Sequence, residues 1–587
     1  MHAGNRRWAL ALLLVAASAV AGGRQEAVLE RLRRHAVVET DLMVAMRDGV
    51  RLATDVARPK GGGPRPTVLV RTPYRKRLAM AAPFVQAGYA FVVQDVRGRY
   101  GSEGVFYPFV HERDDGEDTI AWVAGQPWCD GNVGMVGGSY LGFTQLAAAT
   151  GGPPALRCIL PVVPPSDFDH GTLFFGGALR QELAQGWLLG QSWVSQRVRR
   201  GQVPAEELRR WQPHRRFHKW CWHLPLAEPG PIAVGGPGYA RCWRDMVAGW
   251  ERPDAWRAMS PAAHPEAIRV PTLVVAGFYD IFAQENIDLL LALRARGGSE
   301  ASRTHSHLLI GPWVHGVGRA AGDVDFPAAR AALAEARRKW LPRWLAGERS
   351  DVDRWPPIRA FVMGQDRWLE ADAWPPSGTK PVRFYLADSG LSRRAPAAGI
   401  EPSTFVYDPA QPVPTLGGGN LLLPKGVHDH RRNAGRPDVL TFLGEPLEAD
   451  LVVVGPLRAC LHVSSSAPDT DFTAMLLDVR PDGYMANVQD GIARLRYREG
   501  RDAPRLLQPG EIVKVAIHLW STAYAFKKGH RVGLLVSSSN FPRFDRHLNV
   551  AREPWRWAEP RKATNRVHHD ASHRSYLELP VLAGPAP

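Results

Sequence analysis

The stretch "GMVGGSYLGFTQ", residues 134–145, places one serine among glycines at the end of a short apolar run. The residues before Ser139 are typical of a buried strand, and "YLGFTQLAAA" after it is typical of a helix. Glycine tolerates crowded or strained backbone, so we expect a tight strand-to-helix turn that exposes the Ser139 side chain. The pattern departs from strict G-x-S-x-G, because the following glycine is Gly142. Ser139 is therefore either a nucleophile or part of an ordinary turn.

Apolar, β-branched runs alternate with helix-length segments on both sides of this turn. "PTVLVRTPY", "YAFVVQDVRG", "RCILPVVPP", "PTLVVAGFYD" and "SHLLIGPWVHG" are typical of buried strands. "ERDDGEDTIAWVAGQ" and "AQENIDLLLALRARGG" are typical of helices. This alternation predicts an α/β fold with a mostly parallel sheet, to which we assign residues 36–166 and 270–352.

Two other regions differ from this pattern. Residues 167–269 are rich in Trp, Arg and Pro, with helical periodicity in "ALRQELAQGWLLGQSW". We interpret them as a helical cap over the carboxyl ends of the strands, where α/β sheets bind ligands; a separate domain away from any site is the alternative. Residues 353–587 contain short alternating runs such as "LVVVGPLRACLHVSSS", broken by Gly, Pro and Asp, which predict a β-sandwich or jelly roll.

A nucleophilic serine needs a base, and the base needs a carboxylate that orients it. Asp280 ends the strand pattern "TLVVAGFYD", and His315 follows "HLLIGPW", which gives the order Ser, Asp, His known from α/β-hydrolases. Taken singly, Asp280 is as well explained by a helix N-cap, and His315 by one loop histidine among twenty. Together with Ser139 they predict a catalytic triad.

An oxyanion hole needs two hydrogen-bond donors. The backbone N–H of Tyr140, directly after the serine, is one candidate. The second is expected from the loop in "VLVRTPYRK", which has no HGGG-type glycine run; this favours a side-chain donor, and the phenol of Tyr74 can donate a hydrogen bond. From the residues alone, a packed aromatic side chain is the simpler interpretation of Tyr74.

The first 21 residues have the build of a secretory signal peptide. Arg6 and Arg7 precede an apolar segment, and small residues at 19–21 offer a cleavage site. The arginine pair resembles a twin-arginine signal only weakly, and an uncleaved membrane anchor is the alternative. We expect an exported protein, periplasmic or extracellular, without a stable membrane span after cleavage.

Composition sets further limits on the 587 residues, of which 45% are hydrophobic and 22% charged, as in soluble proteins of several domains. The net charge is +15, but Lys and Arg are scattered and no nucleic-acid motif is present, so we expect no nucleic-acid partner. Neither "VHHDASHRS" nor "DTDFTA" indicates a metal site, and we expect no metal or cofactor. Arg97 and Arg99 of "DVRGRYGSEG" are expected to tie loops together. Cys221 and Cys242 could pair or stay free, and the oligomeric state is not indicated.

Several motifs together resemble the CocE/NonD family of serine hydrolases, which is related to X-Pro dipeptidyl-peptidases and α-amino-acid ester hydrolases. The resemblance implies an α/β-hydrolase domain, an inserted helical cap and a C-terminal jelly roll. It implies Ser139 as nucleophile, Asp280 as acid and His315 as base, with Tyr74 and the Tyr140 amide as oxyanion donors; this reverses the simpler interpretation of Tyr74. The motifs are "RTPY", "DVRGRYGSEG", "QPWCDGNVGMVG", "GGSYLG", "GFYD", "GPWVHG", "VMGQDRWLEADAWPP", "SSSAPDTDFTAMLLDV" and "HHDASHRSYLELPV".

The resemblance also implies acyl transfer from a small-molecule ester or amide, without a metal or organic cofactor. Relatives that recognise α-amino acyl groups carry clustered carboxylates just after the triad acid. Here "YDIFAQE" has Phe282 and Ala283 at those positions, and Glu285 is farther on. We therefore expect carboxylesterase activity, with X-Pro dipeptidyl-peptidase-like, α-amino-acid ester hydrolase or β-lactam acylase activity as alternatives. A noncatalytic glycan-binding protein is the alternative from another class, because jelly rolls also serve lectins.

Overall fold

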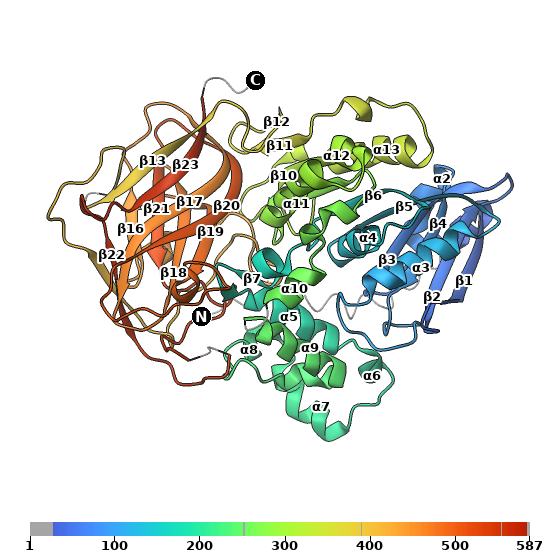
Figure 1. The fold of residues 1–587 in the computed structure, drawn as a ribbon, viewed down its shortest axis with the longest axis horizontal. Coiled ribbons are helices and arrows are strands. Elements are labelled where there is room, and N and C mark those ends of the chain that lie inside the picture. Colours follow the sequence, from blue (N-terminus) through green and yellow to red (C-terminus); the bar gives the residue numbers. More distant parts are fainter. Residues whose placement is uncertain (1–27, 251–252, 389, 553–554, 584–587) are drawn as a thin grey trace.

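A computed structural model describes residues 28–250, 253–388, 390–552 and 555–583. The expected signal peptide, residues 1–21, lies outside the described residues. Figure 1 shows three parts: a helix-covered sheet, a group of helices at one end of it, and a domain of strands beside both. The predicted fold class, an α/β part with an additional all-β domain, is confirmed.

The α/β part is built on a ten-stranded mixed sheet. Its strands from β4 to β11 in spatial order run parallel, as the alternation of strands and helices predicted. Every residue of β9 is buried, as expected of a parallel strand covered on both faces. In spatial order the strands are β1 (Ala36–Ala45), β2 (Arg51–Pro59), β4 (Ala90–Asp95), β3 (Arg65–Thr72), β5 (Cys129–Gly138), β6 (Leu156–Val162), β9 (Leu273–Tyr279), β10 (His307–Val314), β11 (Ile358–Val362) and β12 (Arg367–Ala371).

Helices connect these strands and pack against the sheet. α4 packs against β3, β5 and β6, α11 against β9, and α13 against β5 and β6. α3 begins with acidic residues, Glu112 among them, whose charge suits the partial positive charge of a helix N-terminus. The helices are α2 (Ala82–Gln86), α3 (Glu112–Ala124), α4 (Tyr140–Thr150), α11 (Ala283–Arg296), α12 (Glu300–His305) and α13 (Ala332–Leu345).

The sheet extends further along the chain than predicted. β11 pairs in parallel with β10, with Ile358 opposite Leu308, and β12 pairs back on β11. By sheet membership, the α/β part therefore ends at Ala371 rather than at residue 352. The prolines at 356 and 357, where the composition changes, lie in the connection to β11 and do not end the sheet.

The chain leaves the sheet after β6 and returns to it at β9, and between them it forms mainly short helices. We call residues 167–269 the cap. Its aromatic core, which includes Trp243 and Phe168, is continuous with Phe109 and Tyr140 of the α/β part. The cap helices are α5 (Gln181–Ser192), α6 (Gln196–Arg199), α7 (Ala205–Trp211), α8 (Phe217–Trp220), α9 (Pro237–Val247) and α10 (Pro253–Met259), with a small hairpin of β7 (Phe174–Phe175) and β8 (Ala178–Leu179).

The C-terminal domain contains two antiparallel sheets that share one apolar core, so it is a β-sandwich. One sheet has the order β14-β13-β23-β17-β22-β15, with β20 pairing to β17, and the other has the order β16-β21-β18-β19. The strands are β13 (Thr379–Ala387), β14 (Gly390–Ser392), β15 (Ser403–Tyr407), β16 (Leu440–Leu443), β17 (Leu451–Ser465), β18 (Asp471–Val479), β19 (Met485–Arg494), β20 (Val513–Phe526), β21 (Arg531–Ser537), β22 (Ala563–His568) and β23 (Tyr576–Leu582); a short helix, α14 (Arg431–Ala434), precedes β16.

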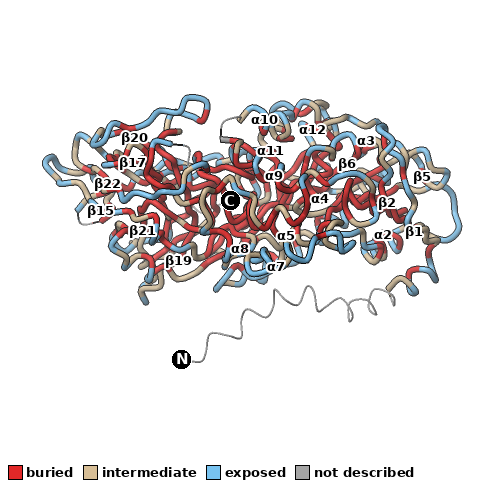
Figure 2. Tube along the Cα trace, turned by 90° about the horizontal axis from the view of Figure 1, so that it is seen from below, coloured by how far each residue is buried: buried red, intermediate tan, exposed pale blue. Residues whose placement is uncertain are grey.

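Buried residues run through the interior of all three parts, and exposed residues line the outside (Figure 2). The carboxylates of "DTDFTA" are engaged structurally: Asp471 pairs with Arg494 at 2.8 Å, and Asp469 with a second arginine. Cys221 and Cys242 are buried free thiols, so they do not pair with each other. In the part of the chain that the structure describes, no helix has both the length and the apolar character that crossing a bilayer requires.

Candidate active site

Ser139 occupies the sharp turn between β5 and α4. Its backbone has φ 59° and ψ −126°, a conformation that residues with a side chain rarely adopt. The Ser139 N–H donates to the carbonyl of Val162 at 2.8 Å, and the Ser139 carbonyl accepts from the N–H of Gly142 at 2.8 Å. The neighbouring strand and the new helix thus hold the strained turn, and strain of this kind is concentrated at functional sites.

Two glycines make room for this turn. A Cβ atom on Gly137 would lie 2.6 Å from the Cβ of Leu141, and the φ of Gly137 is +144°. A Cβ atom on Gly142 would lie 2.9 Å from the Cβ of Pro164. Gly142 therefore allows α4 to pack against the segment after β6, which explains why glycine stands three residues after the serine.

Asp280 and His315 are joined by a hydrogen bond. His315 Nδ1 lies 2.7 Å from Asp280 Oδ2, and the Asp280 side chain is only 1% exposed. The other carboxylate oxygen of Asp280 accepts the backbone N–H of Phe282 at 2.8 Å. Because Nδ1 faces the carboxylate, Nε2 is the imidazole nitrogen left to accept a proton.

Parallel strands bring the three triad candidates to one edge of the sheet. Ser139 follows β5, Asp280 follows β9 and His315 follows β10, in a sheet where the order is β5-β6-β9-β10. The Phe282 ring lies edge-to-face with the His315 imidazole at 5.6 Å and lines the same cavity as Ser139. Among the described residues, no hydrogen bond joins Ser139 to His315; in unliganded sites such catalytic contacts are often long.

Both candidate oxyanion donors flank Ser139. Tyr74 follows β3, and its hydroxyl oxygen accepts the indole N–H of Trp187 at 3.1 Å. Burial raises the pKa of the Tyr74 phenol, and hydrogen bonds with Trp187 and Ser139 act in the opposite direction. The backbone N–H of Tyr140 is the first of α4, and the first N–H groups of a helix have no acceptor within it.

A buried polar network holds the side chain of Tyr140 in place. Its hydroxyl donates to Glu112 Oε1 at 2.8 Å and accepts the backbone N–H of Phe109 at 2.9 Å. The second carboxylate oxygen of Glu112 pairs with Arg71 at 2.9 Å. Burial raises the pKa of the Tyr140 phenol well above its usual value. Because its side chain is fixed in this way, Tyr140 can offer the site its backbone N–H but not its hydroxyl.

Arg97 and Arg99 tie loops together, as predicted. Arg97 forms ion pairs of 2.6 Å with two carboxylates. Arg99 donates to the carbonyl of Pro73 and to the side-chain oxygen of Gln191, both at 2.9 Å. Arg99 thereby joins the residue that precedes Tyr74 to helix α5 of the cap.

The cavity beside Ser139 is mainly apolar and is formed by all three parts of the chain. Phe109 comes from the α/β part, Trp187 from the cap, and Leu421 from the C-terminal domain. The Leu421 loop is held by Glu182 of α5, a buried carboxylate that accepts the N–H groups of residues 421–423. The domain of strands is therefore part of the wall of the site, which the sequence did not predict.

Glu285 is engaged elsewhere. Its Oε2 accepts the backbone N–H groups of Ser166 and Asp167 at 2.6 and 2.7 Å, and the hydroxyl of Thr172 at 2.9 Å. The side chain is buried, and burial raises the pKa of Glu285 to about 8. Glu285 therefore fastens the beginning of the cap to α11, and its carboxylate is not free to bind a substrate ammonium.

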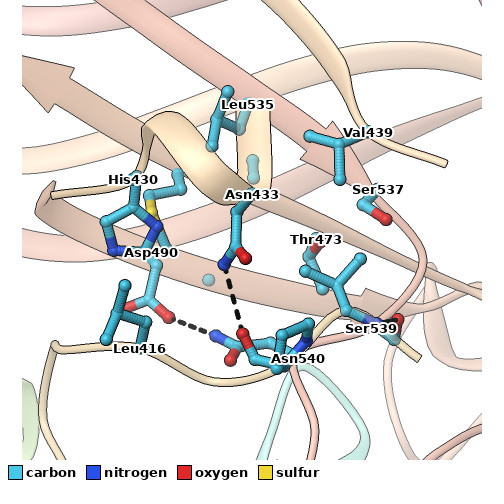
Figure 3. A pocket seen from close by; sticks show the side chains of 15 residues that line it. Leu416, His430, Asn433, Val439, Thr473, Asp490, Leu535, Ser537, Ser539 and Asn540 are labelled. Atoms are coloured by element: carbon cyan, nitrogen blue, oxygen red, sulfur yellow. Dashed lines mark hydrogen bonds between the residues drawn. The ribbon is translucent and has the colours of Figure 1, made fainter. Parts of the chain in front are cut away.

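A further cavity lies inside the C-terminal domain, between α14 and the strands β18 and β21 (Figure 3). Its lining includes His430 and Asp490. Asp490 forms an ion pair with Arg543 at 2.5 Å and accepts a hydrogen bond from Asn540 at 2.8 Å. The Arg543 guanidinium neutralises the Asp490 carboxylate, and Asn540 binds its second oxygen, so the carboxylate is engaged structurally.

Comparison with known proteins agrees with this geometry. Residues 48–317 match the X-Pro dipeptidyl-peptidase (S15) family, and residues 350–578 match the X-Pro dipeptidyl-peptidase C-terminal non-catalytic domain. The chain is 38% identical over 581 residues to cocaine esterase of Rhodococcus sp. (strain MB1 Bresler), covering 93% of this chain and 98% of that one. This chain belongs to the CocE/NonD family of serine hydrolases.

Two solved structures resemble this CocE/NonD hydrolase over most of their length. An aminopeptidase from the marine sediment archaeon Thaumarchaeota archaeon has a TM-score of 0.79 and 27% identity, covering 94% of this chain and 97% of that one. An α-amino acid ester hydrolase has a TM-score of 0.77 and 28% identity, covering 93% and 97%. The protein is a serine hydrolase that acts on ester or amide bonds, in contrast to the alternative of a noncatalytic glycan-binding protein.

Proposed function

We propose that this CocE/NonD hydrolase is an exported carboxylesterase in which Ser139, His315 and Asp280 form the catalytic triad. The observation that carries the proposal is the 2.7 Å hydrogen bond between His315 and the buried carboxylate of Asp280. Both follow strands that share an edge of the sheet with the strand before Ser139. An oriented imidazole and a serine on a half-buried turn, both at the carboxyl ends of parallel strands, are the groups that acyl transfer requires.

In the acylation step, His315 Nε2 takes the proton of the Ser139 hydroxyl as the oxygen attacks the substrate carbonyl. Asp280 holds the imidazole in the required tautomer and stabilises the imidazolium that forms. His315 then protonates the leaving alcohol, and the acyl group stays on Ser139. Water enters, loses a proton to His315, and releases the acid in the same way.

The Tyr74 hydroxyl and the Tyr140 amide donate to the oxyanion that develops on the substrate carbonyl. Both donors are in place before the reaction, so little reorganisation is needed as the charge forms. The N-terminus of α4 adds its partial positive charge at the same position. Removal of one such donor slows an enzyme by roughly two to three orders of magnitude.

The cavity supports a hydrophobic acyl group, because aromatic and aliphatic side chains such as Phe109, Trp187 and Phe282 line it. An ester substrate agrees with the similarity to a cocaine esterase. The similarity to an aminopeptidase and an α-amino acid ester hydrolase makes α-amino acyl transfer the alternative. The engagement of Glu285 by three donors disfavours it.

Active-site labelling combined with a substrate panel tests this function. A fluorophosphonate should modify Ser139, identified by peptide mass mapping, and the Ser139→Ala variant should be neither labelled nor active. The panel compares p-nitrophenyl esters of apolar acids with the matching anilides and with α-amino acyl, X-Pro and β-lactam substrates. Esters of apolar acids should be hydrolysed fastest. A label on another residue would refute the assignment of Ser139, and a preference for α-amino acyl substrates would refute the ester specificity.

Export is proposed from residues 1–21, where paired arginines, an apolar segment and small residues follow each other. The test is to fractionate cells that express the whole chain and to sequence the N-terminus of the protein recovered. A soluble exported protein that begins at residue 22 is expected. A membrane-bound protein that retains residues 1–21 would show an uncleaved anchor instead.

A further inference from the structure

We propose that Trp187 is a positioning residue that makes the Tyr74 hydroxyl a hydrogen-bond donor to the oxyanion; this inference rests on the function proposed above. The Trp187 indole N–H donates to the Tyr74 hydroxyl oxygen at 3.1 Å. An indole N–H can only donate, so the Tyr74 oxygen must be the acceptor in this pair. The single proton of the phenol is therefore left for another partner.

Ser139 lines the same cavity as Tyr74, so a substrate carbonyl bound beside Ser139 can receive that proton as a hydrogen bond. Tyr74, Trp187 and Ser139 line one cavity, and the Tyr74 hydroxyl accepts the indole N–H of Trp187 there. Since the bond with Trp187 occupies an acceptor position of the phenol oxygen, the phenol proton remains available to a substrate oxygen in this cavity. When Ser139 attacks a carbonyl, the oxyanion develops beside it, and an already oriented O–H can bind it without first rotating.

Stacking holds the indole of Trp187 in place. Its ring lies nearly parallel to that of Tyr140, with centroids 5.8 Å apart and an interplanar angle of 17°. The Trp187 ring also stacks on the Phe109 ring, with centroids 5.8 Å apart and an interplanar angle of 25°. Tyr140 is in turn fixed by the buried network around Glu112. Stacking on Tyr140 and Phe109 therefore orients the indole N–H of Trp187 toward Tyr74.

A second contact fixes the helix relative to the Tyr74 loop. Gln191 stands four residues after Trp187, on the same face of α5. Its side chain accepts from Arg99, which also binds the carbonyl of Pro73, next to Tyr74. Arg99 therefore fixes the position of the Tyr74 loop relative to helix α5. In this way the cap supports the proposed oxyanion donor.

The sharpest test removes the N–H and keeps the ring. Replacing Trp187 by benzothienylalanine, in which sulfur stands where the indole has its N–H, preserves shape and stacking. Loss of one hydrogen bond of this kind should lower kcat for a p-nitrophenyl ester about tenfold, with KM changed less than about twofold. Affinity for a boronic acid that forms a tetrahedral adduct should fall by about the same factor.

A double-mutant cycle with Tyr74→Phe separates positioning from packing. If Trp187 acts through the Tyr74 hydroxyl, the benzothienylalanine replacement should cause no further loss in the Tyr74→Phe enzyme. Leu183→Ala is the matched control: Leu183 lies on the same helix and lines the same cavity, so its effect should be equal in both backgrounds.

Two results would overturn the inference while leaving the proposed function intact. One is an equal loss of kcat from the Trp187 replacement with and without the Tyr74 hydroxyl. The other is no loss in the enzyme that retains Tyr74. The failure of the proposed function itself looks different, because it would appear as activity that survives in Ser139→Ala.

Discussion

Leu421, in the C-terminal domain, lines the same cavity as Ser139, although 282 positions separate them in the sequence. Its loop is anchored to the cap because Glu182 accepts three consecutive backbone N–H groups. A Cβ atom on Gly419 of the same loop would lie 2.9 Å from the carbonyl oxygen of Asp280, so the loop also approaches the proposed triad acid. A domain of the type described as non-catalytic thus helps to shape the site.

Leu421→Ala should change acyl specificity. Removing an apolar side chain from the cavity wall should lower kcat/KM for esters of large apolar acids by about tenfold and leave acetate esters within about twofold. The measurement is kcat/KM for p-nitrophenyl esters of increasing acyl size. Leu422→Ala is the control, because the Leu422 side chain follows Leu421 in the chain but is 53% exposed. Equal effects of the two variants would show that Leu421 does not contact the acyl group.

Tyr74→Phe removes one proposed oxyanion donor and retains the aromatic ring. We expect kcat to fall by roughly two to three orders of magnitude, because the donor acts on charge that develops only in the transition state. Steady-state kinetics with a p-nitrophenyl ester, together with a thermal melt to verify folding, provide the test. A folded variant with unchanged kcat would remove Tyr74 from the oxyanion hole.

Asp280→Asn should leave the backbone intact and disable the base. The asparagine oxygen can still accept the N–H of Phe282, so the turn after β9 should persist. His315 would lose the carboxylate that sets its tautomer, and such a change lowers kcat by about 10⁴ in serine proteases. A loss of less than about tenfold in a folded variant would show that Asp280 is not the triad acid.

The raised pKa of Glu285 predicts that the free energy of unfolding depends on pH. Burial raises its pKa to about 8 in the folded protein, against about 4.3 in an unfolded chain. The folded state therefore binds a proton that the unfolded state has released, so this contribution is fully present below about pH 4.3 and is lost as pH rises toward 8.

Glu285→Gln should remove this part of the pH dependence. The Tm of the variant relative to that of the unchanged protein should therefore rise between about pH 4.3 and 8. Thermal melts of both proteins across this range provide the measurement. A Tm difference that stays constant with pH would mean that Glu285 is not protonated in the folded state.

The residues at strand ends were accessible from the sequence because parallel strands place their carboxyl ends at one edge. Ser139, Asp280 and His315 each end a recognisable apolar run, and their order fits one known arrangement. The family resemblance, and with it the enzyme class, was confirmed by comparison. The pattern of apolar runs does not indicate which side chains from distant segments contact each other in the site.

Trp187 and Glu112 were missed for that reason. In the sequence, Glu112 fits the acidic start of a helix and Trp187 fits an aromatic cap core. Only the structure shows that Glu112 binds Tyr140 and that Trp187 binds Tyr74. Leu421 lies in the glycine-rich stretch "TLGGGNLLLPKG", which has no strand or helix period to indicate its partner. The composition changes at the prolines before β11, but the pairing of β11 with β10 continues the sheet beyond them.

A crystal structure of the enzyme with a boronic acid inhibitor tests the central claim most directly. We predict boron bonded to the Ser139 oxygen, His315 Nε2 within hydrogen-bonding distance of the adduct, and one boronate oxygen bound by the Tyr74 hydroxyl and the Tyr140 amide. Boron bonded to another residue, or an imidazole of His315 too far away to reach the adduct, would contradict it.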